Sequence, residues 1–294
     1  MKKNLVKKAV LPALAALLCS VIALTSVSYA WFTMGDTATV DGMSMQVTSA
    51  GGLQISATGD EGSFKSTLTQ ADLSGIQITD AKPVSTDGVI TNGKLDFYTG
   101  TIVNGELAES AASATSNYIS FDFYIKVTSA NTLSLDAGSV VISNGKETHL
   151  ASRVAFISLG SAQTAAEAKA LVGTGVSGAA KIWEPNSTIR STAVQNSGNT
   201  SNGQAVAYKG IADLDGTKPV ISESNVTVFS PAQNGATGEK MLETTEAAEL
   251  FALGAGYNKI RVYIWLEGQD VDCVNEVSGG TFTIKLNFKQ NTLE

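Results

Sequence analysis

The sequence predicts an all-β protein: an antiparallel β-sandwich or jelly-roll with an inserted loop-rich segment containing short helices, preceded by an N-terminal apolar signal helix. Three observations support this fold class. The 294 residues include 28 glycines and only 16% charged residues, which suits strands and turns. Several segments alternate apolar and polar residues, and helical patterns are few and short. We therefore expect a signal peptide at residues 1–30 and one β-sandwich domain at 31–294, with the insertion at about 160–256.

The clearest strand pattern is YISFDFYIKV at residues 118–127, where every second residue is apolar, so that the apolar side chains share one face. Such alternation is typical of a half-buried strand. The pattern returns at 259–267 and 281–289, which we expect to be antiparallel neighbours because a stretch with Gly, Asp and Asn joins them. Residues 43–47 alternate in the same way. Shorter strand candidates lie at residues 53–57, 95–98, 133–142, 154–159, 205–208 and 226–229.

Helical signals are confined to the insertion. Residues 161–172 are rich in Ala and begin at Ser161, a candidate N-cap. Residues 244–256 place a threonine before an apolar group and Gly254 after it, which predicts a second short helix. Between them, residues 186–203 are rich in Ser, Asn, Gly and Thr and have too few apolar residues for a core. We expect them to form a long surface loop.

The N-terminus has the three parts of an export signal. Four lysines precede an apolar run at residues 9–27, and Ser28 and Ala30 supply the small residues that a signal peptidase needs. We predict cleavage after Ala30. The apolar run of about 19 residues, at about 1.5 Å per residue, also approaches the ~30 Å thickness of a bilayer core. A retained membrane anchor is therefore the alternative.

Charge and cysteine content restrict the partners of the mature chain. Loss of residues 1–30 removes four lysines and no acid, so the formal net charge moves from −7 to −11. This balance argues against nucleic acid or anionic lipid as the main partner, and leaves membrane contact to the N-terminal segment alone. Cys273 becomes the only cysteine, which excludes an internal disulfide. We expect a buried small side chain there, with an intermolecular bridge as the alternative.

The ionisable residues give weak indications of a site. His149 is the only histidine, so a hydrolytic triad would need it, but its turn-like context predicts a surface or turn role. Four oxygen-bearing side chains follow the 259–267 strand and are candidate calcium ligands: Glu267, Asp270, Asp272 and Asn275. Their spacing is irregular, so a solvated turn is the simpler interpretation. No catalytic residue and no other cofactor is expected.

Two tryptophans are candidate glycan contacts. Trp183 and the outward-facing Trp265 could form a stacking platform for a polysaccharide. The alternative, which we favour, is that the inserted segment covers this outward face.

The stretch SYAWFT, which follows an unusually apolar signal and precedes a Thr- and Val-rich strand, resembles the start of the TasA and camelysin family of Gram-positive secreted proteins. YISFDFYIKV, RVAFI, IWEPN and VYIWLEGQDVDC are similar to segments of uncharacterised clostridial-type surface proteins. The resemblance implies a jelly-roll subunit that assembles into matrix fibres by adding its N-terminal segment to the next subunit as a strand. Here this donor strand would begin at Trp31 and Phe32 and run to about Val40. The same residues could instead fold back onto their own domain.

These observations favour a secreted, non-enzymatic structural protein of the bacterial surface or extracellular matrix that forms a homopolymer through its sheet edges. A membrane-anchored adhesin or carbohydrate-binding module is the second hypothesis. A secreted hydrolase is the third, and it would depend on His149.

Overall fold

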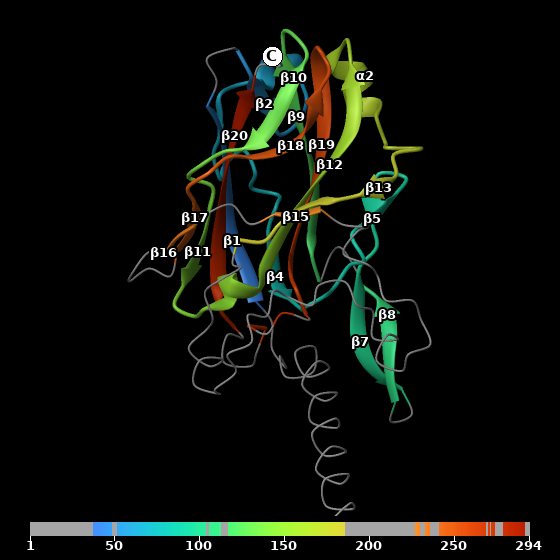
Figure 1. Cartoon of the computed structure of the whole chain (residues 1–294), viewed down its shortest axis with the longest axis vertical. Coiled ribbons are helices and arrows are strands. Elements are labelled where there is room, and N and C mark those ends of the chain that lie inside the picture. The colour runs from blue at the N-terminus through green and yellow to red at the C-terminus, as the bar shows by residue number, and fades with distance from the viewer. Residues whose placement is uncertain are drawn as a thin grey trace, which may run out of the picture.

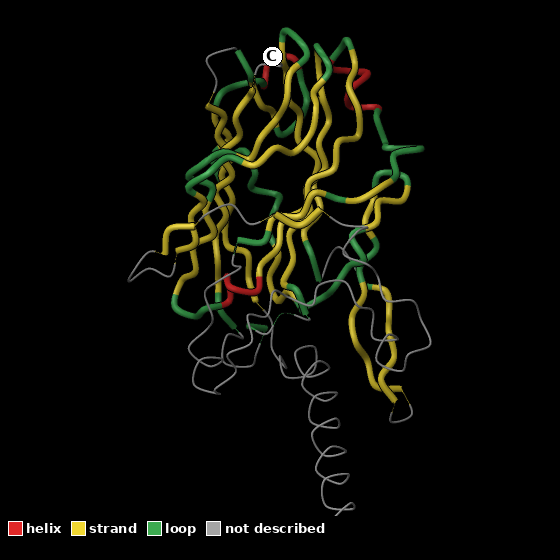
Figure 2. The backbone as a smooth tube through the Cα atoms, in the orientation of Figure 1, coloured by secondary structure: helices red, strands yellow, loops and turns green. Residues whose placement is uncertain are grey.

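The computed structural model describes residues 38–48, 52–103, 106–112, 117–185, 227–229, 233–235, 241–268, 270, 272–273 and 279–291. The predicted signal peptide with Ser28 and Ala30, the start of the candidate donor strand at Trp31 and Phe32, and the segments 186–203 and 205–208 lie outside these residues. The architecture is mostly β, with antiparallel and mixed sheets and one short α-helix (Figures 1 and 2). No helix in the described ranges is long and apolar enough to cross a membrane.

The first sheet has nine strands. Its main order is β16 (Gln233–Gly235), β17 (Met241–Thr244), β11 (Val140–Asn144), β20 (Thr281–Asn291), β1 (Ala38–Thr48) and β3 (Thr67–Leu68). β10 (Asn131–Leu135) pairs with β20 and with β18 (Ala248–Leu253), and β4 (Ile78–Ala81) pairs with the start of β1. β1 runs parallel to β20, whereas the other pairs in this sheet are antiparallel. The sheet is therefore mixed: the predicted antiparallel pairing holds for its other pairs, but not for β1 with β20.

The second sheet has six strands. Their order is β15 (Thr227–Phe229), β14 (Lys181–Trp183), β12 (Ser152–Ala162), β19 (Gly256–Leu266), β9 (Ile119–Val127) and β2 (Gln54–Ser56). β14 and β15 are parallel and the remaining pairs are antiparallel. The smaller elements are a three-stranded sheet of β13 (Gly178–Ala179), β5 (Val89–Thr91) and β6 (Lys94–Leu95), and a hairpin of β7 (Tyr98–Val103) and β8 (Glu106–Ala111).

The main core lies between the two large sheets. Every second residue of β9, β19 and β20 points into it, and β1 does the same from Met43 onward, after a bulge between Val40 and Gly42. The rings of Phe123 on β9 and Phe288 on β20 stack across the interface with centroids 5.4 Å apart. The period-two pattern read from residues 43–47, 118–127, 259–267 and 281–289 is therefore confirmed, because burial of one face is what holds the sheets together.

A second apolar cluster covers the opposite face of β19. Tyr263 and Trp265 pack there against Phe97, which lies edge-on to Trp265 with ring centroids 5.2 Å apart. The covering residues come from the segment 84–97 and from Ala180, whereas Ile182 belongs to β14 of the second sheet itself. β19 is therefore buried on both faces, and the insertion supplies only part of the cover.

Two predicted relationships differ in the structure. The strands at 259–267 and 281–289 are not neighbours: β19 pairs with β12 and β9 in one sheet, and β20 pairs with β1, β10 and β11 in the other. Their connection crosses from one sheet to the other. The candidate strand at 133–142 forms two strands, β10 and β11, because the chain turns between them at 136–139.

Of the two predicted helices, one is confirmed and one was wrong. α2 (Ala165–Ala170) begins at Thr164, whose side chain accepts a hydrogen bond from the Glu167 N–H in a capping box; Ser161 is not the cap. Residues 244–256 contain no helix, since β18 occupies 248–253. A bulge opposite Leu133 and Ser134 lets β18 bury every third residue, which imitates a helical period.

Two further short elements complete the described chain, the 3-10 turns η1 (Glu61–Ser63) and η2 (Thr148–Ala151). Within the range assigned to the insertion, β14 and β15 join the second sheet, and β16, β17 and β18 join the first. The described part of this range is thus built into both sheets.

Candidate functional site

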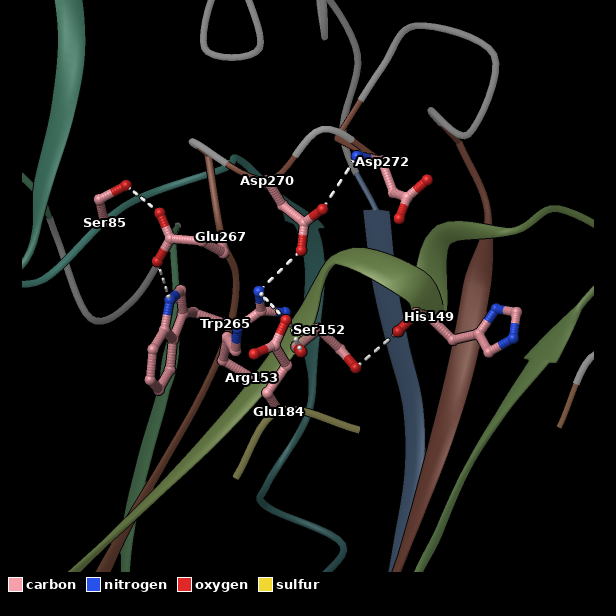
Figure 3. A network of polar contacts seen from close by, with 9 residues as sticks. All are labelled: Ser85, His149, Ser152, Arg153, Glu184, Trp265, Glu267, Asp270 and Asp272. Carbon is pink, nitrogen blue, oxygen red and sulfur yellow. Dashed lines mark hydrogen bonds and ion pairs between the residues drawn. The ribbon is translucent and has the colours of Figure 1, made fainter. Parts of the chain in front are cut away.

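A buried ionic network, centred on Arg153, lies where β12 begins and β19 ends (Figure 3). The side chain of Arg153 is fully buried. Its Nη2 donates to Glu184 Oε1 at 2.9 Å and to Asp270 Oδ2 at 2.7 Å, and its Nη1 donates to the Ser152 carbonyl at 2.9 Å. One guanidinium thus joins β12 to the end of β14 and to the loop after β19.

A third carboxylate, Glu267, extends the network toward the covering layer. Glu267 accepts hydrogen bonds from the Ser85 hydroxyl and from the Trp265 indole N–H, the latter at 3.1 Å. Its backbone N–H donates to the Ala151 carbonyl at 2.8 Å, and Val84 forms a bridge beside it. The loop after β19 is therefore held to both the second sheet and the segment that covers it.

The network lies at the end of the molecule where β1 begins. Thr281 lies opposite both Thr39 on β1 and Asn144, the last residue of β11. η2 then connects β11 directly to β12, whose first residue, Ser152, lies opposite Leu266. β1 consequently begins at the end of the sheets that contains Arg153.

Burial decides what this network can do. An arginine removed from water is tolerated only when carboxylates and carbonyls occupy its donors, and a carboxylate there needs donors in return. Glu184 and Asp270 share Arg153, and Asp270 Oδ1 also accepts the Asp272 N–H at 2.9 Å. The groups bind one another, so this arrangement fixes a loop and joins strands.

His149 lies in η2 and is 2% exposed. The expected turn is confirmed, but the expected surface position was wrong, because η2 connects the two packed sheets and all four of its residues are buried. The His149 carbonyl accepts from the Ser152 hydroxyl at 2.7 Å, while the imidazole points away from the carboxylates around Arg153 (Figure 3). The histidine on which a hydrolase would depend is thus turned away from this network.

The candidate calcium ligands that the structure describes are all buried. Glu267, Asp270 and Asp272 are each at most 1% exposed, so the solvated turn was the wrong interpretation. Glu267 and Asp270 face different donors, and within the described ranges no group of three or more His, Cys, Asp and Glu side chains could hold a metal ion. Asn275 lies outside the described residues. Calcium binding here stays a prediction.

Cys273 carries a fully buried thiol in the main core, as expected for a small apolar side chain. Burial raises the pKa of the thiol well above its ordinary value, and the neighbouring Asp270 and Glu267 raise it further. The neutral thiol is therefore the form that this site stabilises.

The two candidate glycan contacts are also buried. Trp183 and Trp265 are 0% and 1% exposed and belong to different apolar clusters, on opposite faces of the second sheet. Neither ring offers a surface on which a sugar could stack, which corrects the idea of an exposed aromatic platform. The outward face at Trp265 is covered, as we favoured, but the ring that packs on Trp265 is Phe97, which lies outside the inserted segment.

Besides Ser85, the site residues that the sequence analysis missed are Arg153 and Glu184. A signal was present: each is a charge at the end of an apolar strand, in SRVAFISL and in KIWEPN. Charges at such positions are retained in cores only when paired. Pairing the two segments as β12 and β14 would have placed the charges together.

The end of the candidate donor strand is already part of this domain. Val40 is buried in β1, opposite Phe282 on β20 and Ile78 on β4. A donor segment can therefore include only residues before Ala38, the first residue of β1.

Comparison with protein-family models, curated proteins and solved structures finds no match to this chain.

Proposed function

We propose that the mature chain is a secreted, non-enzymatic structural subunit of a bacterial surface or extracellular matrix. Its sandwich or jelly-roll core would assemble into fibres through addition of an N-terminal strand to the next subunit. The observation that supports this most is the position of β1. From its first residues it is paired on both sides, Ala38 with Ala81 of β4 and Thr39 with Thr281 of β20.

This position gives a donor segment a rigid attachment. Residues 31–37 immediately precede a strand inside the first sheet, and seven residues span up to about 24 Å when extended. Such a length reaches a neighbouring subunit. An extended peptide that joins a sheet edge gains affinity from backbone hydrogen bonds and specificity from alternate side chains. The Trp31–Phe32 pair would favour burial against such a neighbour.

The buried polar network supports the same reading. Its charges are bonded to one another and join β12, β14 and the loop after β19. Their role in the described domain is to hold strands together, which suits a structural subunit. The adhesin or carbohydrate-binding alternative has no such support, since Trp183 and Trp265 are buried.

Deletion of the donor segment tests the proposal. Purified chains of residues 31–294 and 38–294 are compared by electron microscopy and by sedimentation over a range of concentrations. We expect fibres or large oligomers from 31–294, and monomers from 38–294 with an unchanged circular dichroism spectrum. Persistent monomers of 31–294 at high concentration would exclude assembly, and equal assembly of both chains would exclude this donor.

A further inference from the structure

The second sheet has an edge that is only half covered. β2 is the edge neighbour of β9, but it pairs only with Tyr124, Ile125 and Lys126. The preceding residues of β9, Ile119 to Phe123, pair with β19 on one side. On their other side, the described chain supplies no strand partner and no backbone hydrogen bond. We call residues 119–123 on this side the open edge.

The hydrogen bonds of β2 show which groups face the open edge. Ile55 exchanges both of its backbone hydrogen bonds with Lys65, so its polar groups point away from β9. Gln54 and Ser56 must then face β9, and the residues opposite them, Lys126 and Tyr124, face β2. By the same alternation, Ser120 and Asp122 direct their N–H and C=O groups to the open edge.

Side-chain burial agrees with this geometry. Ser120 is exposed and Asp122 is partly buried on the outer face, where Arg261 binds its carboxylate with contacts of 2.7 and 3.0 Å. On the core face, Ile119 and Phe123 are buried, but Phe121 between them is only partly covered, although it packs against the main core. A strand added here would complete the cover of Phe121 and bind the backbone of Ser120 and Asp122.

The N-terminal segment has the pattern that such an edge accepts. In WFTMGDT, residues 31–37, Phe32 and Met34 would lie on one face of a strand and Thr33 on the other. Phe32 and Met34 suit the core face beside Phe121, and Thr33 suits the exposed face beside Ser120.

The open edge also lies at the end of the molecule where this segment leaves the fold. Ile119, the first residue of β9, lies opposite Ile264, near the end of β19, and the end of β19 adjoins the start of β12. This is the end at which β1 begins (Figure 1). We propose that the open edge of one subunit accepts residues 32–35 of a second copy as an added strand. This inference rests on the proposed function and names its acceptor.

A proline at the open edge is the first test. Ser120→Pro removes the edge-facing N–H and places a ring where the added strand would lie, whereas the hydrogen bonds of β9 to β19 use other residues. Ser120→Ala keeps the N–H and is the matched control. In the 31–294 chain, we expect Ser120→Ala to assemble as the parent does. We expect Ser120→Pro to raise the concentration needed for assembly at least ~10-fold, the effect of losing about 1.4 kcal/mol of binding free energy.

The folding of each variant is checked by circular dichroism and thermal unfolding. If folded Ser120→Pro assembles as well as Ser120→Ala, the open edge is not the acceptor. The 38–294 deletion tests the proposed function separately, because it removes the donor and leaves β9 intact. Assembly lost in the deletion but kept in Ser120→Pro would therefore overturn the acceptor and leave strand addition standing.

Disulfide trapping is the second test, and it does not depend on the proline variant. Cysteines are placed at Ser120 and at either Thr33 or Gly35, two donor registers on the exposed face, because a disulfide needs Cα atoms about 4.4–6.8 Å apart. The mature chain's own Cys273 is buried. We expect mild oxidation to give a ladder of covalent oligomers on a non-reducing gel, absent from the single-cysteine controls. A cross-linked monomer would show that each chain fills its own edge, and the absence of any cross-link in both registers would place the donor elsewhere; either result overturns the proposal.

Discussion

Replacing Arg153 with methionine tests whether the buried network stabilises the fold. The substitution keeps an unbranched side chain but removes the donors that Glu184 and Asp270 share. Because both carboxylates are nearly inaccessible to solvent, water cannot replace the lost partner. Removing one member of a buried ion pair typically costs about 3–5 kcal/mol. For a chain of this size, where 1 kcal/mol shifts Tm by about 2–4 °C, the expected fall in Tm is roughly 6–20 °C.

The assay is thermal and urea unfolding of the 38–294 chain, followed by circular dichroism. A variant that also carries Glu184→Gln and Asp270→Asn separates charge from packing, since it removes the uncompensated carboxylates together with the arginine. We expect this triple variant to recover much of the lost stability, because a neutral buried set carries a smaller desolvation cost. An Arg153→Met variant as stable as the parent, or a triple variant no better than the single one, would refute the reasoning.

Three further results are expected. Gly256 has φ +100°, and a Cβ there would lie 2.4 Å from a backbone oxygen, whereas Gly145 has φ +91° but its Cβ would meet no atom within 4 Å. Gly256→Ala should therefore lower the free energy of unfolding by about 1–3 kcal/mol more than Gly145→Ala does. Urea unfolding of the two variants measures this difference. The raised pKa of Cys273 means that the unfolded thiol ionises first, so stability should fall above about pH 9, and less steeply in Cys273→Ala. A hydrogen bond from Lys65 lowers the pKa of Asp72 from 3.8 to about 2. The stability that the ionised Asp72 contributes above pH 3.8 should therefore be lost as pH falls to 2. In acid titrations, Asp72→Asn should reduce the slope of stability against pH in this range.

The sequence predicted strands well where one face meets the main core. Alternation in β1, β9 and β20 follows directly from burial of every second residue, and this signal is local. The alternation does not indicate which strands pair with one another. β19 and β20 are adjacent in the sequence and equally regular, yet they lie in different sheets because each finds longer ladders elsewhere.

The helix expected at 244–256 failed for a physical reason that no local pattern contains. In β18 the bulge brings Leu250 and Leu253 to the core side, a spacing of three that fits a helix as well as a distorted strand. Only pairing with β10 decides between them. The alternation correctly places Trp265 on the outward face of β19, but it does not indicate which part of the chain covers that face.

The candidate site was harder to predict than the fold, because its members are far apart in the sequence. Glu267 and Asp270 were noticed as an acidic loop, whereas their partners Ser85 and Arg153 are 182 and 117 residues away in the sequence. An acidic loop at the end of a strand suggests carboxylates that face solvent or bind a cation. The buried arginine that contradicts this interpretation, Arg153, lies on a different strand, β12.

The parallel pairing of β1 and β20 gives the proposed assembly a mechanical consequence. If residues ahead of Ala38 join a neighbouring subunit, tension along a fibre enters each domain through the start of β1. β1 is paired with β20 from Thr39 to Thr48, so a pull along the strand stresses the ladder in shear, with many hydrogen bonds opposing it together. A hairpin pulled apart from its open end would instead lose its bonds one at a time. The Arg153 network joins β12, β14 and the loop after β19 at this same end, so the place where tension would enter is also the place where the described strands are cross-linked by buried charge.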